Sequence, residues 1–321
     1  RFGASNAPPR RRILLILGDD MKRRVFAALF AAAFLFFGLA TSQSASAQDS
    51  RSPIGAKHVV WIGSDGFGSH YVNWDELPNL KKMKENGAWT LHMRSVLPSS
   101  SAINWETQIA GAPSEMHGYR TWGSKEPDLP PIYLTKNGRF PCVFGVLKDS
   151  FDAKSTVVYS WDGIGYLFDK AAVVDDQSVK DDEAVYQTAL KQLATKPDFA
   201  FIYFGEPDHV GHGIGWGTPE YQAMLTTVDD YVGKLLAAIE ENGMMEDTVV
   251  IFTSDHGGTG KGHGDLLMEH MEVPAIFYGK DVKVGEITDV VVHFDVAATI
   301  AWILGAERPQ AWRGVPIPAF K

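Results

Sequence analysis

Acidic residues and histidines gather in three short segments of the chain. Asp65 lies in the first segment, Asp208 and His212 lie in the second, and Asp255 and His256 lie in the third. Carboxylates and imidazoles are common ligands of divalent metal ions in proteins. Asp208 and His212 are four residues apart, so they can face one ion from a single helical turn. The pattern predicts a metal site.

A fourth segment, residues 260–264, is rich in glycine and contains His263. Five of the ten histidines of the chain lie between residues 209 and 270, a clustering that random placement rarely produces. Each segment also has an ordinary structural interpretation, since Asp-Gly is often a turn and Asp-His-Gly often starts a helix. The prediction of a metal site therefore depends on the segments in combination, with each acidic segment following an apolar run.

The composition limits which chemistry is possible. The chain has 321 residues, of which 45% are hydrophobic and 21% are charged, as is typical of a folded globular protein. Its single cysteine, Cys142, excludes an intramolecular disulfide framework and any zinc or iron-sulfur site built from cysteines. We expect Cys142 to be a buried apolar residue. Any metal site must therefore use histidine and carboxylate ligands.

The charge of the chain argues against a partner with a large anionic surface. The net charge is -9, although residues 1–47 hold seven Lys/Arg against two acidic residues. The rest of the chain is therefore more acidic still. It lacks the excess of basic residues with which proteins bind duplex nucleic acid or an anionic membrane surface. A negatively charged substrate would need a local positive charge, which bound metal ions can supply.

Short apolar runs alternate with segments of helical periodicity from residue 57 onward. The alternation predicts a three-layer α/β/α sandwich with a mostly parallel central sheet and helices on both faces. Ligands bind at the carboxyl ends of the strands in such folds, which is where Asp65, Asp208 and Asp255 fall. The expected strands are 59–62, 156–159, 199–204, 249–252 and 275–278, and the expected helices are roughly 78–86, 102–110, 179–195, 219–242 and 294–304.

Residues 123–175 interrupt this alternation, because they are rich in proline, glycine and aromatic residues. We expect a small cap insertion there that faces the substrate. The alternative is that the aromatic side chains simply pack against the sheet. The chain has no internal repeat and no low-complexity linker after residue 52, so we expect one catalytic domain over residues 48–321.

The N-terminal residues have the features of a targeting sequence. Met21 begins a basic segment, an apolar run follows over residues 25–40, and small residues stand at 45–47. This order predicts a signal peptide over residues 21–47 and a periplasmic or secreted protein. A membrane anchor is the alternative, although the apolar run is shorter than the roughly 20 residues that span a bilayer. Residues 1–20 are expected to be a non-native upstream extension.

The sequence resembles the alkaline phosphatase superfamily, specifically its nucleotide pyrophosphatase/phosphodiesterase branch, over essentially all of residues 57–315. The resemblance implies the same three-layer fold. It also implies two Zn²⁺ ions about 4 Å apart over a Ser or Thr nucleophile, an arrangement suited to in-line phosphoryl displacement. The segments that carry the resemblance are Asp65-Gly66, Pro98–Asn104, Gly111 with His117-Gly118, Glu206–Asp208 with Gly211-His212, and Ser254–Gly257.

The resemblance also implies roles for individual residues. The family's phosphodiesterases take the third ligand of one ion from a much later segment of the chain. Here His263 is the candidate, as in the related ethanolamine-phosphate transferases, and His293 is the alternative. The implied ligands of the first ion are Asp65, Asp255 and His256 together with the nucleophile, and those of the second ion are Asp208, His212 and His263.

The implied nucleophile is Ser101, because the family places its Ser or Thr three residues before the asparagine that Asn104 matches. Ser100 is the alternative. A position at the start of the helix expected at 102–110 favours a bound anion. Trp122 departs from the family, whose phosphodiesterases have an asparagine there that donates to the phosphoryl oxygen. The preference for phosphate monoesters or diesters therefore stays open.

These features together predict a secreted or periplasmic two-zinc phosphohydrolase that cleaves phosphate mono- or diesters through a phosphoseryl intermediate. The expected partner is a small phosphorylated substrate, with no nucleic-acid duplex and no membrane after signal cleavage, and the oligomeric state stays open. A sulfatase is not expected, because the Cys-x-Pro-x-Arg motif is absent. The alternatives are a phosphotransferase or phosphonate-cleaving relative, and a non-catalytic binding protein stabilised by metal. The serine beside the six ligand candidates favours catalysis.

Overall fold

The computed structural model of the protein describes residues 51–321, and the expected signal peptide lies outside them. Eight strands of this region form one sheet in the order β4-β3-β5-β1-β6-β7-β2-β8. No helix in this part of the chain is long and apolar enough to cross a membrane. The strands are β1 (His58–Ser64), β2 (Ala88–Arg94), β3 (Ser155–Tyr159), β4 (Asp175–Ser178), β5 (Phe199–Phe204), β6 (Thr248–Thr253), β7 (Glu272–Gly279) and β8 (Gly285–Glu286).

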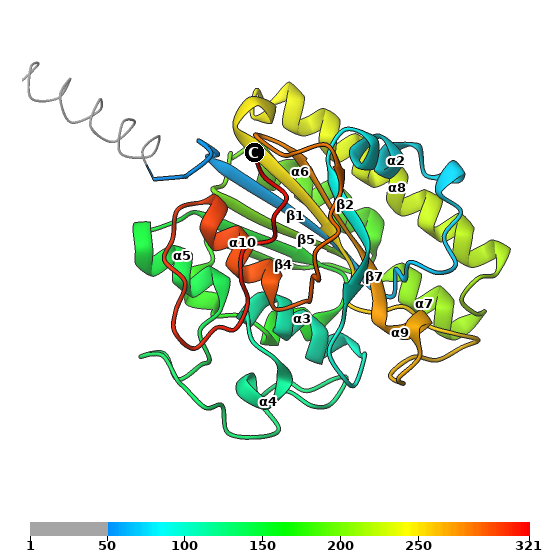
Figure 1. Cartoon of the computed structure of the whole chain (residues 1–321), viewed down its shortest axis with the longest axis horizontal. Coiled ribbons are helices and arrows are strands. Elements are labelled where there is room, and N and C mark those ends of the chain that lie inside the picture. The colour runs from blue at the N-terminus through cyan, green and yellow to red at the C-terminus, as the bar shows by residue number, and fades with distance from the viewer. Residues whose placement is uncertain (1–50) are drawn as a thin grey trace, which may run out of the picture. The chain divides into compact units, whose positions relative to one another are not determined.

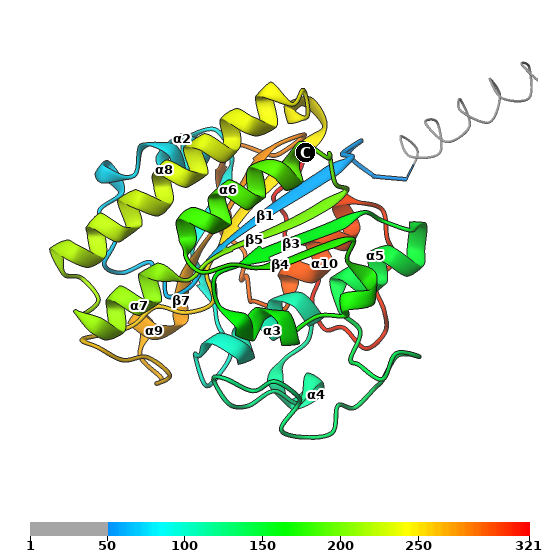
Figure 2. The same cartoon turned by 180° about the vertical axis from the view of Figure 1, so that it is seen from behind.

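Helices cover both faces of the sheet (Figures 1 and 2). Helices α3, α5 and α10 pack on one face, and α2, α6 and α8 pack on the other. The predicted three-layer α/β/α sandwich is confirmed. The helices are α2 (Pro78–Glu85), α3 (Ser101–Ala110), α4 (Ser114–His117), α5 (Val143–Phe151), α6 (Asp182–Leu193), α7 (Glu206–Gly213), α8 (Pro219–Glu241), α9 (Met268–Met271) and α10 (Asp295–Ile303).

The central strands are apolar at nearly every position because both of their faces are buried. Successive side chains of a strand point to opposite faces of the sheet. In β1, Val59 and Trp61 belong to the core beneath α3, α5 and α10. Val60 and Ile62 belong to the core beneath α2, α6 and α8. This double burial explains why the expected strands appear as continuous apolar runs.

Strand β1 lies between β5 and β6 and is parallel to both. Its last residue, Ser64, is level with Phe204 of β5, and Gly63 is level with Thr253 of β6. The three strands therefore end at the same edge of the sheet. Only the pairs β6–β7 and β7–β2 of the described sheet are antiparallel, and the other neighbouring strands are parallel. The sheet is therefore mostly parallel, as predicted.

All the expected strands and helices are present, with ends within three residues of their expected positions. The expected ranges did not include the strands β2, β4 and β8 or the helices α4, α5, α7 and α9. β4 is the polar segment Asp-Asp-Gln-Ser at one edge of the sheet, and β8 has only two residues. Such edge segments become strands through pairing with a neighbour, because their own residues have little preference for strand.

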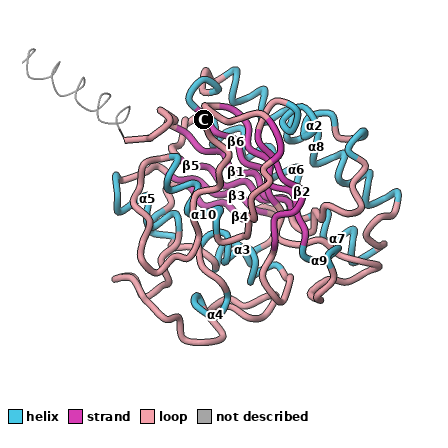
Figure 3. Tube along the Cα trace, viewed as in Figure 1, coloured by secondary structure: helices cyan, strands magenta, loops and turns pink. Residues whose placement is uncertain are grey.

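Residues 123–175, expected as an insertion, divide into two parts in the structure. The part up to 142 is mostly loop (Figure 3), whereas the rest contains α5 and β3 of the sandwich. The aromatic residues of this segment also differ in their burial. Phe144 and Phe168 are buried in the core, while Tyr133 is 55% exposed. Some of these aromatic side chains thus pack under the sheet, and others lie on the surface of the loop.

Candidate metal centre and nucleophile

The predicted site residues follow three neighbouring strands. Asp65 comes directly after β1, and Asp255 and His256 come shortly after β6. Asp208 lies in the first turn of α7, which begins two residues after the end of β5. Ser101 is the first residue of α3. Since the three strands end at one edge of the sheet, their acidic residues meet there.

Asp65, Asp255 and His256 form the first group of potential metal ligands. The Nε2 atom of His256 lies 3.4 Å from Oδ1 of Asp65 and 3.2 Å from Oδ2 of Asp255. The three side chains are buried, and one ligand atom from each lies within 4.8 Å of the others. This separation is compatible with one small cation held between the three side chains.

Ser101 presents its hydroxyl group to this first group. Its Oγ atom lies 3.2 Å from Nε2 of His256 and 3.5 Å from Oδ1 of Asp65. Ser100, the N-cap residue of α3, lines the same cleft. Of these two serines, Ser101 is the one whose side-chain oxygen contacts the side chains of two ligand candidates. The geometry therefore favours Ser101 over Ser100 as the nucleophile.

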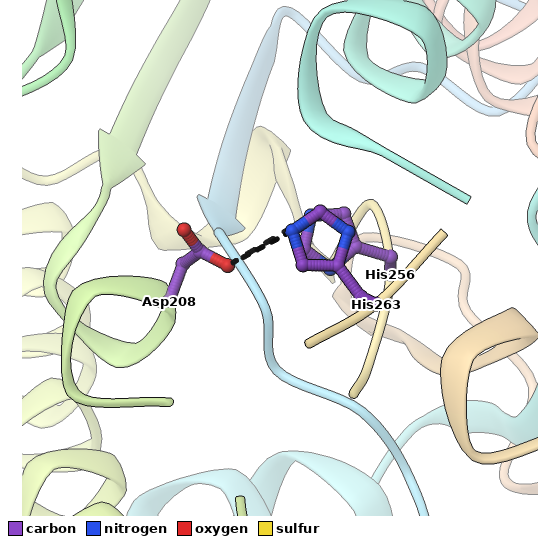
Figure 4. Close-up of side chains that lie close together, drawn as sticks. All are labelled: Asp208, His256 and His263. Carbon is purple, nitrogen blue, oxygen red and sulfur yellow. Dashed lines mark ion pairs between the residues drawn. The ribbon is translucent and has the colours of Figure 1, made fainter. Parts of the chain in front are cut away.

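Asp208, His212 and His263 form the second group, and His256 adjoins it, because ligand atoms of Asp208, His256 and His263 lie within 4.8 Å of one another. Nε2 of His212 lies 3.1 Å from Nε2 of His263 and 3.6 Å from Oδ1 of Asp208. That same oxygen lies 3.7 Å from Nε2 of His263 and 3.9 Å from Nε2 of His256. Figure 4 shows Asp208 facing the stacked rings of His256 and His263. The two groups therefore adjoin, and His256 lies between them.

His293 belongs to neither group of potential ligands found in the described part of the chain. It is buried, and its Nδ1 lies 3.0 Å from Oδ1 of Asn104. The amide of Asn104 donates to the carbonyl oxygens of Val96 and Pro98, in the loop before α3. His293 therefore contacts Asn104, which holds this loop, whereas His263 lies beside Asp208 and His212.

Each imidazole of the two groups is held on its Nδ1 side by a backbone carbonyl. Because a carbonyl oxygen can only accept, each Nδ1 carries the proton and donates it. Each Nε2 atom keeps a lone pair directed at the site, as a zinc ligand requires. The pairs are His256 with Gly257 at 3.0 Å, His212 with Lys261 at 3.0 Å, and His263 with Ser99 at 2.9 Å.

Two buried carboxylate oxygens at the site have no hydrogen-bond donor: Oδ2 of Asp255 and Oδ1 of Asp208. Both face Nε2 of His256, whose lone pair cannot satisfy them. The other oxygen of Asp255 accepts from the backbone N–H of Gly66 at 3.1 Å. Buried acceptors without donors are costly, and a divalent cation would satisfy the oxygens and the imidazoles together. These residues therefore fit a metal centre.

Burial and mutual repulsion raise the pKa values of the carboxyl groups. Burial, and next the charge of Asp65, raises the pKa of Asp208 to about 8. The same two causes, joined by the charge of Asp208, raise the pKa of Asp255 well above its ordinary value. Burial lowers the pKa of His256 and His263 to about 3. The imidazoles are thus neutral, and the acidic groups need a cation before they can ionise together.

A cleft of about 560 Å³ gives access to both groups and to Ser101. Trp122, Trp161 and Tyr203 also line it, and Trp122 is 67% exposed. The backbone N–H of Ala102 donates to the carbonyl oxygen of Trp122 at 3.1 Å, which places Trp122 beside the start of α3. The tryptophan rings offer a flat apolar surface to any molecule in the cleft.

Two contacts of Asp65 were missed by the sequence patterns. Its Oδ2 accepts hydrogen bonds from the hydroxyl of Tyr203 at 2.6 Å and from Nε1 of Trp105 at 2.9 Å. Tyr203 stands in an apolar strand and Trp105 in a buried helix, so both have the pattern of core residues. The available signal is that a buried Tyr or Trp needs an acceptor for its polar group.

A known protein family matches this part of the chain. Residues 59–265 match the family described as type I phosphodiesterase/nucleotide pyrophosphatase. The matched segment contains Ser101 and both groups of potential ligands. The matched segment therefore includes every residue of the candidate site.

Two curated relatives are similar to the chain in sequence. Ectonucleotide pyrophosphatase/phosphodiesterase family member 3 of Bos taurus is 27% identical over 228 residues, which cover 62% of this chain and 24% of the relative. A bis(5'-adenosyl)-triphosphatase of Mus musculus is 26% identical over 243 residues, which cover 70% and 51%. The chain thus spans about half of the length of the mouse relative and about a quarter of the cattle protein.

A solved structure shares the fold. Murine ectonucleotide pyrophosphatase/phosphodiesterase 5, in an inactive form with AMP, superimposes with a TM-score of 0.65. The match covers 80% of this chain and 97% of the murine chain, at 15% sequence identity. At this identity the likeness concerns the fold alone.

Proposed function

The chain belongs to the type I phosphodiesterase/nucleotide pyrophosphatase family, and from this premise we propose that it is a metal-dependent phosphoester hydrolase. The proposed enzyme holds two zinc ions, uses Ser101 as its nucleophile and forms a phosphoseryl intermediate. The observation that carries the proposal is the position of Oγ of Ser101, which lies against the first ligand group. A purely structural metal site needs neither a hydroxyl group at its edge nor an open cleft.

Each of the two groups of side chains holds one of the proposed zinc ions. Three imidazoles among the ligands favour zinc, because magnesium prefers octahedral sites made of oxygen atoms. Two bound zinc ions supply positive charge for phosphoryl oxygens and lower the pKa of a coordinated hydroxyl. The proposed ligands are Asp65, Asp255, His256 and Ser101 for one ion, and Asp208, His212 and His263 for the other.

The chain's own residues perform the substitution at phosphorus. Oγ of Ser101 gives up its proton and forms a bond to phosphorus, while the bond from phosphorus to the leaving oxygen breaks and that oxygen takes up a proton from solvent. Water then attacks the same phosphorus atom, its oxygen stays on the released product, and one of its protons returns to the displaced Oγ to restore the serine. Ser101 is the first residue of α3, and the N-terminal end of a helix favours an anionic phosphoryl group beside it.

We propose a small phosphorylated compound as the substrate, in keeping with a cleft of about 560 Å³. One curated relative is named for the hydrolysis of a bis-adenosyl triphosphate, and the murine structure contains AMP. The rings of Trp122 and Trp161 in the cleft support a substrate with a flat or apolar substituent.

We also propose that the enzyme acts in the periplasm or after secretion. The signal peptide expected over residues 21–47 supports this location, and it lies outside the described residues. The acidic composition of the rest of the chain agrees with a substrate that is neither duplex nucleic acid nor a membrane surface.

Hydrolysis of chromogenic phosphoesters tests the proposal. Purified protein would be assayed with 4-nitrophenyl phosphate and bis(4-nitrophenyl) phosphate before and after removal of metal with a chelator. We expect the chelator to abolish hydrolysis, and zinc to restore it better than magnesium. Full activity in metal-free protein would contradict the proposal. The ratio of the two rates determines the ester preference that Trp122 leaves open.

The same assay separates hydrolysis from phosphoryl transfer to another acceptor. A hydrolase acting on the monoester releases nitrophenol and inorganic phosphate in equal amounts, with or without an added alcohol. A transferase would release nitrophenol in excess of phosphate once an amino alcohol is present. We expect equal release of the two products.

A further inference from the structure

We infer that Tyr203 and Trp105 are positioning residues that hold Asp65 with one chosen oxygen toward the metal centre. The inference rests on the proposed two-zinc function and extends it to two residues outside the proposed ligand sets. Both residues donate to Oδ2 of Asp65. The other oxygen, Oδ1, is the one that faces the ligand group.

The two oxygens of Asp65 have different surroundings. Oδ2 receives the hydroxyl of Tyr203 at 2.6 Å and Nε1–H of Trp105 at 2.9 Å. Oδ1 lies 3.4 Å from Nε2 of His256 and 3.5 Å from Oγ of Ser101. A carboxylate with one oxygen held by two donors presents only the other oxygen to a cation. The contacts therefore select Oδ1 as the ligand atom beside the nucleophile.

The two donors come from different elements of the fold and contact each other. Tyr203 lies on β5 and Trp105 on α3, and their rings meet edge to face with centroids 5.3 Å apart. Both side chains are buried. A carboxylate between such fixed donors cannot rotate without breaking two hydrogen bonds, each of which is strengthened by the charge of the acceptor.

The backbone of β1 leaves room for the indole of Trp105. A Cβ atom at Gly63 would lie 2.6 Å from Cη2 of Trp105, which is closer than real side chains approach. Glycine two residues before Asp65 therefore allows Trp105 to reach the carboxylate. In Asp255, Oδ1 accepts from the backbone N–H of Gly66 at 3.1 Å and has the hydroxyl of Ser254 at 3.5 Å. In Asp65, both donors to Oδ2 are aromatic side chains, so its orientation depends on Tyr203 and Trp105.

Zinc binding by the variant Tyr203→Phe tests the inference, because this change removes the hydroxyl and keeps the ring. Partners of this kind typically contribute about 10- to 100-fold to metal affinity. We expect the dissociation constant of one zinc ion to rise by about that factor, while the other ion binds as in the wild type. The measurement is a competition titration of metal-free protein against a chelator of known zinc affinity. Trp105→Phe should weaken the same ion.

The matched control is Tyr119→Phe. Tyr119 and Tyr203 are both 2% exposed, and the hydroxyl of Tyr119 donates to the carbonyl oxygen of Tyr166. The control removes the same atoms from a buried tyrosine outside both ligand groups. It should leave both zinc affinities unchanged even if its melting temperature falls as much as that of Tyr203→Phe. An equal loss of zinc affinity in the control would overturn the positioning role.

Activity at saturating zinc separates positioning from direct contact with substrate, because Tyr203 also lines the cleft. A positioning residue predicts that hydrolysis by Tyr203→Phe recovers most of its rate when zinc is raised above the new dissociation constant. A loss of activity with both zinc affinities intact would overturn the inference. If the wild-type protein itself binds no zinc, the proposed metal centre fails, and this outcome is distinct from failure of the inference alone.

Discussion

The imidazole ring of His263 stacks on that of His256, with ring centroids 3.7 Å apart and planes 15° from parallel. His256 follows strand β6, whereas His263 lies in the glycine-rich segment seven residues later. The segment therefore folds back over the end of the strand. Burial lowers the pKa of both imidazoles to about 3, so the stacked rings are neutral and do not repel each other as cations.

The stacked position predicts the effect of His263→Ala. We expect bound zinc to fall by close to one ion per chain, because Asp208 and His212 alone cannot complete a three-ligand site. Hydrolysis should fall by more than about 100-fold, since even outer-shell partners contribute about 10- to 100-fold. Elemental analysis of dialysed protein gives the zinc content, and circular dichroism checks the fold.

His293→Ala is the comparison for this prediction. His293 contacts Asn104 and belongs to neither ligand group of the described residues. The variant should keep both zinc ions and lose thermal stability, because a buried hydrogen-bond partner of Asn104 is gone. Loss of zinc in His293→Ala with normal zinc in His263→Ala would transfer the ligand role to His293.

Ser101→Ala should lower the rate of hydrolysis by at least about three orders of magnitude and leave no covalent phosphoenzyme. The reason is that Oγ of Ser101 is the oxygen placed against Asp65 and His256. Acid-quenched reactions analysed by mass spectrometry detect phosphoserine. Ser100→Ala is the control, with an expected change of less than about tenfold. The reverse result would mean that Ser100 is the nucleophile.

Zinc binding should release protons near neutral pH. The raised pKa values of Asp208, at about 8, and of Asp255 keep protons on these groups in metal-free protein. Zinc requires their ionised forms, so zinc affinity should fall as the pH is lowered from 8 to 6. Calorimetry in buffers with different ionisation heats counts the released protons. Asp208→Asn should release fewer, and binding without proton release at pH 6 would refute the prediction.

Glu106, a buried residue of α3, predicts a pH effect on stability. Burial raises its pKa from the ordinary 4.5 to about 8, and its Oε2 has no hydrogen-bond donor. The folded state thus prefers the protonated form of Glu106. Its stabilising contribution to the free energy of unfolding is greatest below pH 4.5 and is lost as the pH rises to about 8. The loss is about 1.4 kcal/mol for each pH unit in this interval.

The variant Glu106→Gln isolates this contribution, because glutamine keeps the shape and cannot ionise. The free energy of unfolding of the wild type should fall relative to that of the variant between pH 5 and 8. Urea denaturation of both proteins with saturating zinc measures the difference. Parallel pH profiles for the two proteins would show that Glu106 does not titrate in this range.

The central elements could be predicted from sequence because their pattern comes from burial. Strand β5 coincides with the apolar run expected at 199–204, and its double burial requires that run. The edge strand β4 is polar and becomes a strand through its pairing with β3. Its formation depends on a neighbour that is distant in sequence, so local composition could not reveal it.

The proposed ligands could be predicted because their residue types are unusual after apolar strands. Tyr203 and Trp105 could not, because an aromatic residue in an apolar element is ordinarily a core residue. Their bonds to Asp65 connect positions 138 and 40 residues apart in sequence, respectively. Only the folded arrangement of β1, β5 and α3 brings these groups together.

The most direct test of the two-ion hydrolase is the rate of phosphoester hydrolysis as a function of zinc bound per chain. Metal-free protein would be titrated with zinc, and bound zinc and initial rate would be measured on the same samples. We predict no hydrolysis without zinc and a rate that rises to a plateau at two ions per chain. A full rate without zinc, or a plateau at one ion per chain, would contradict the proposed metal centre.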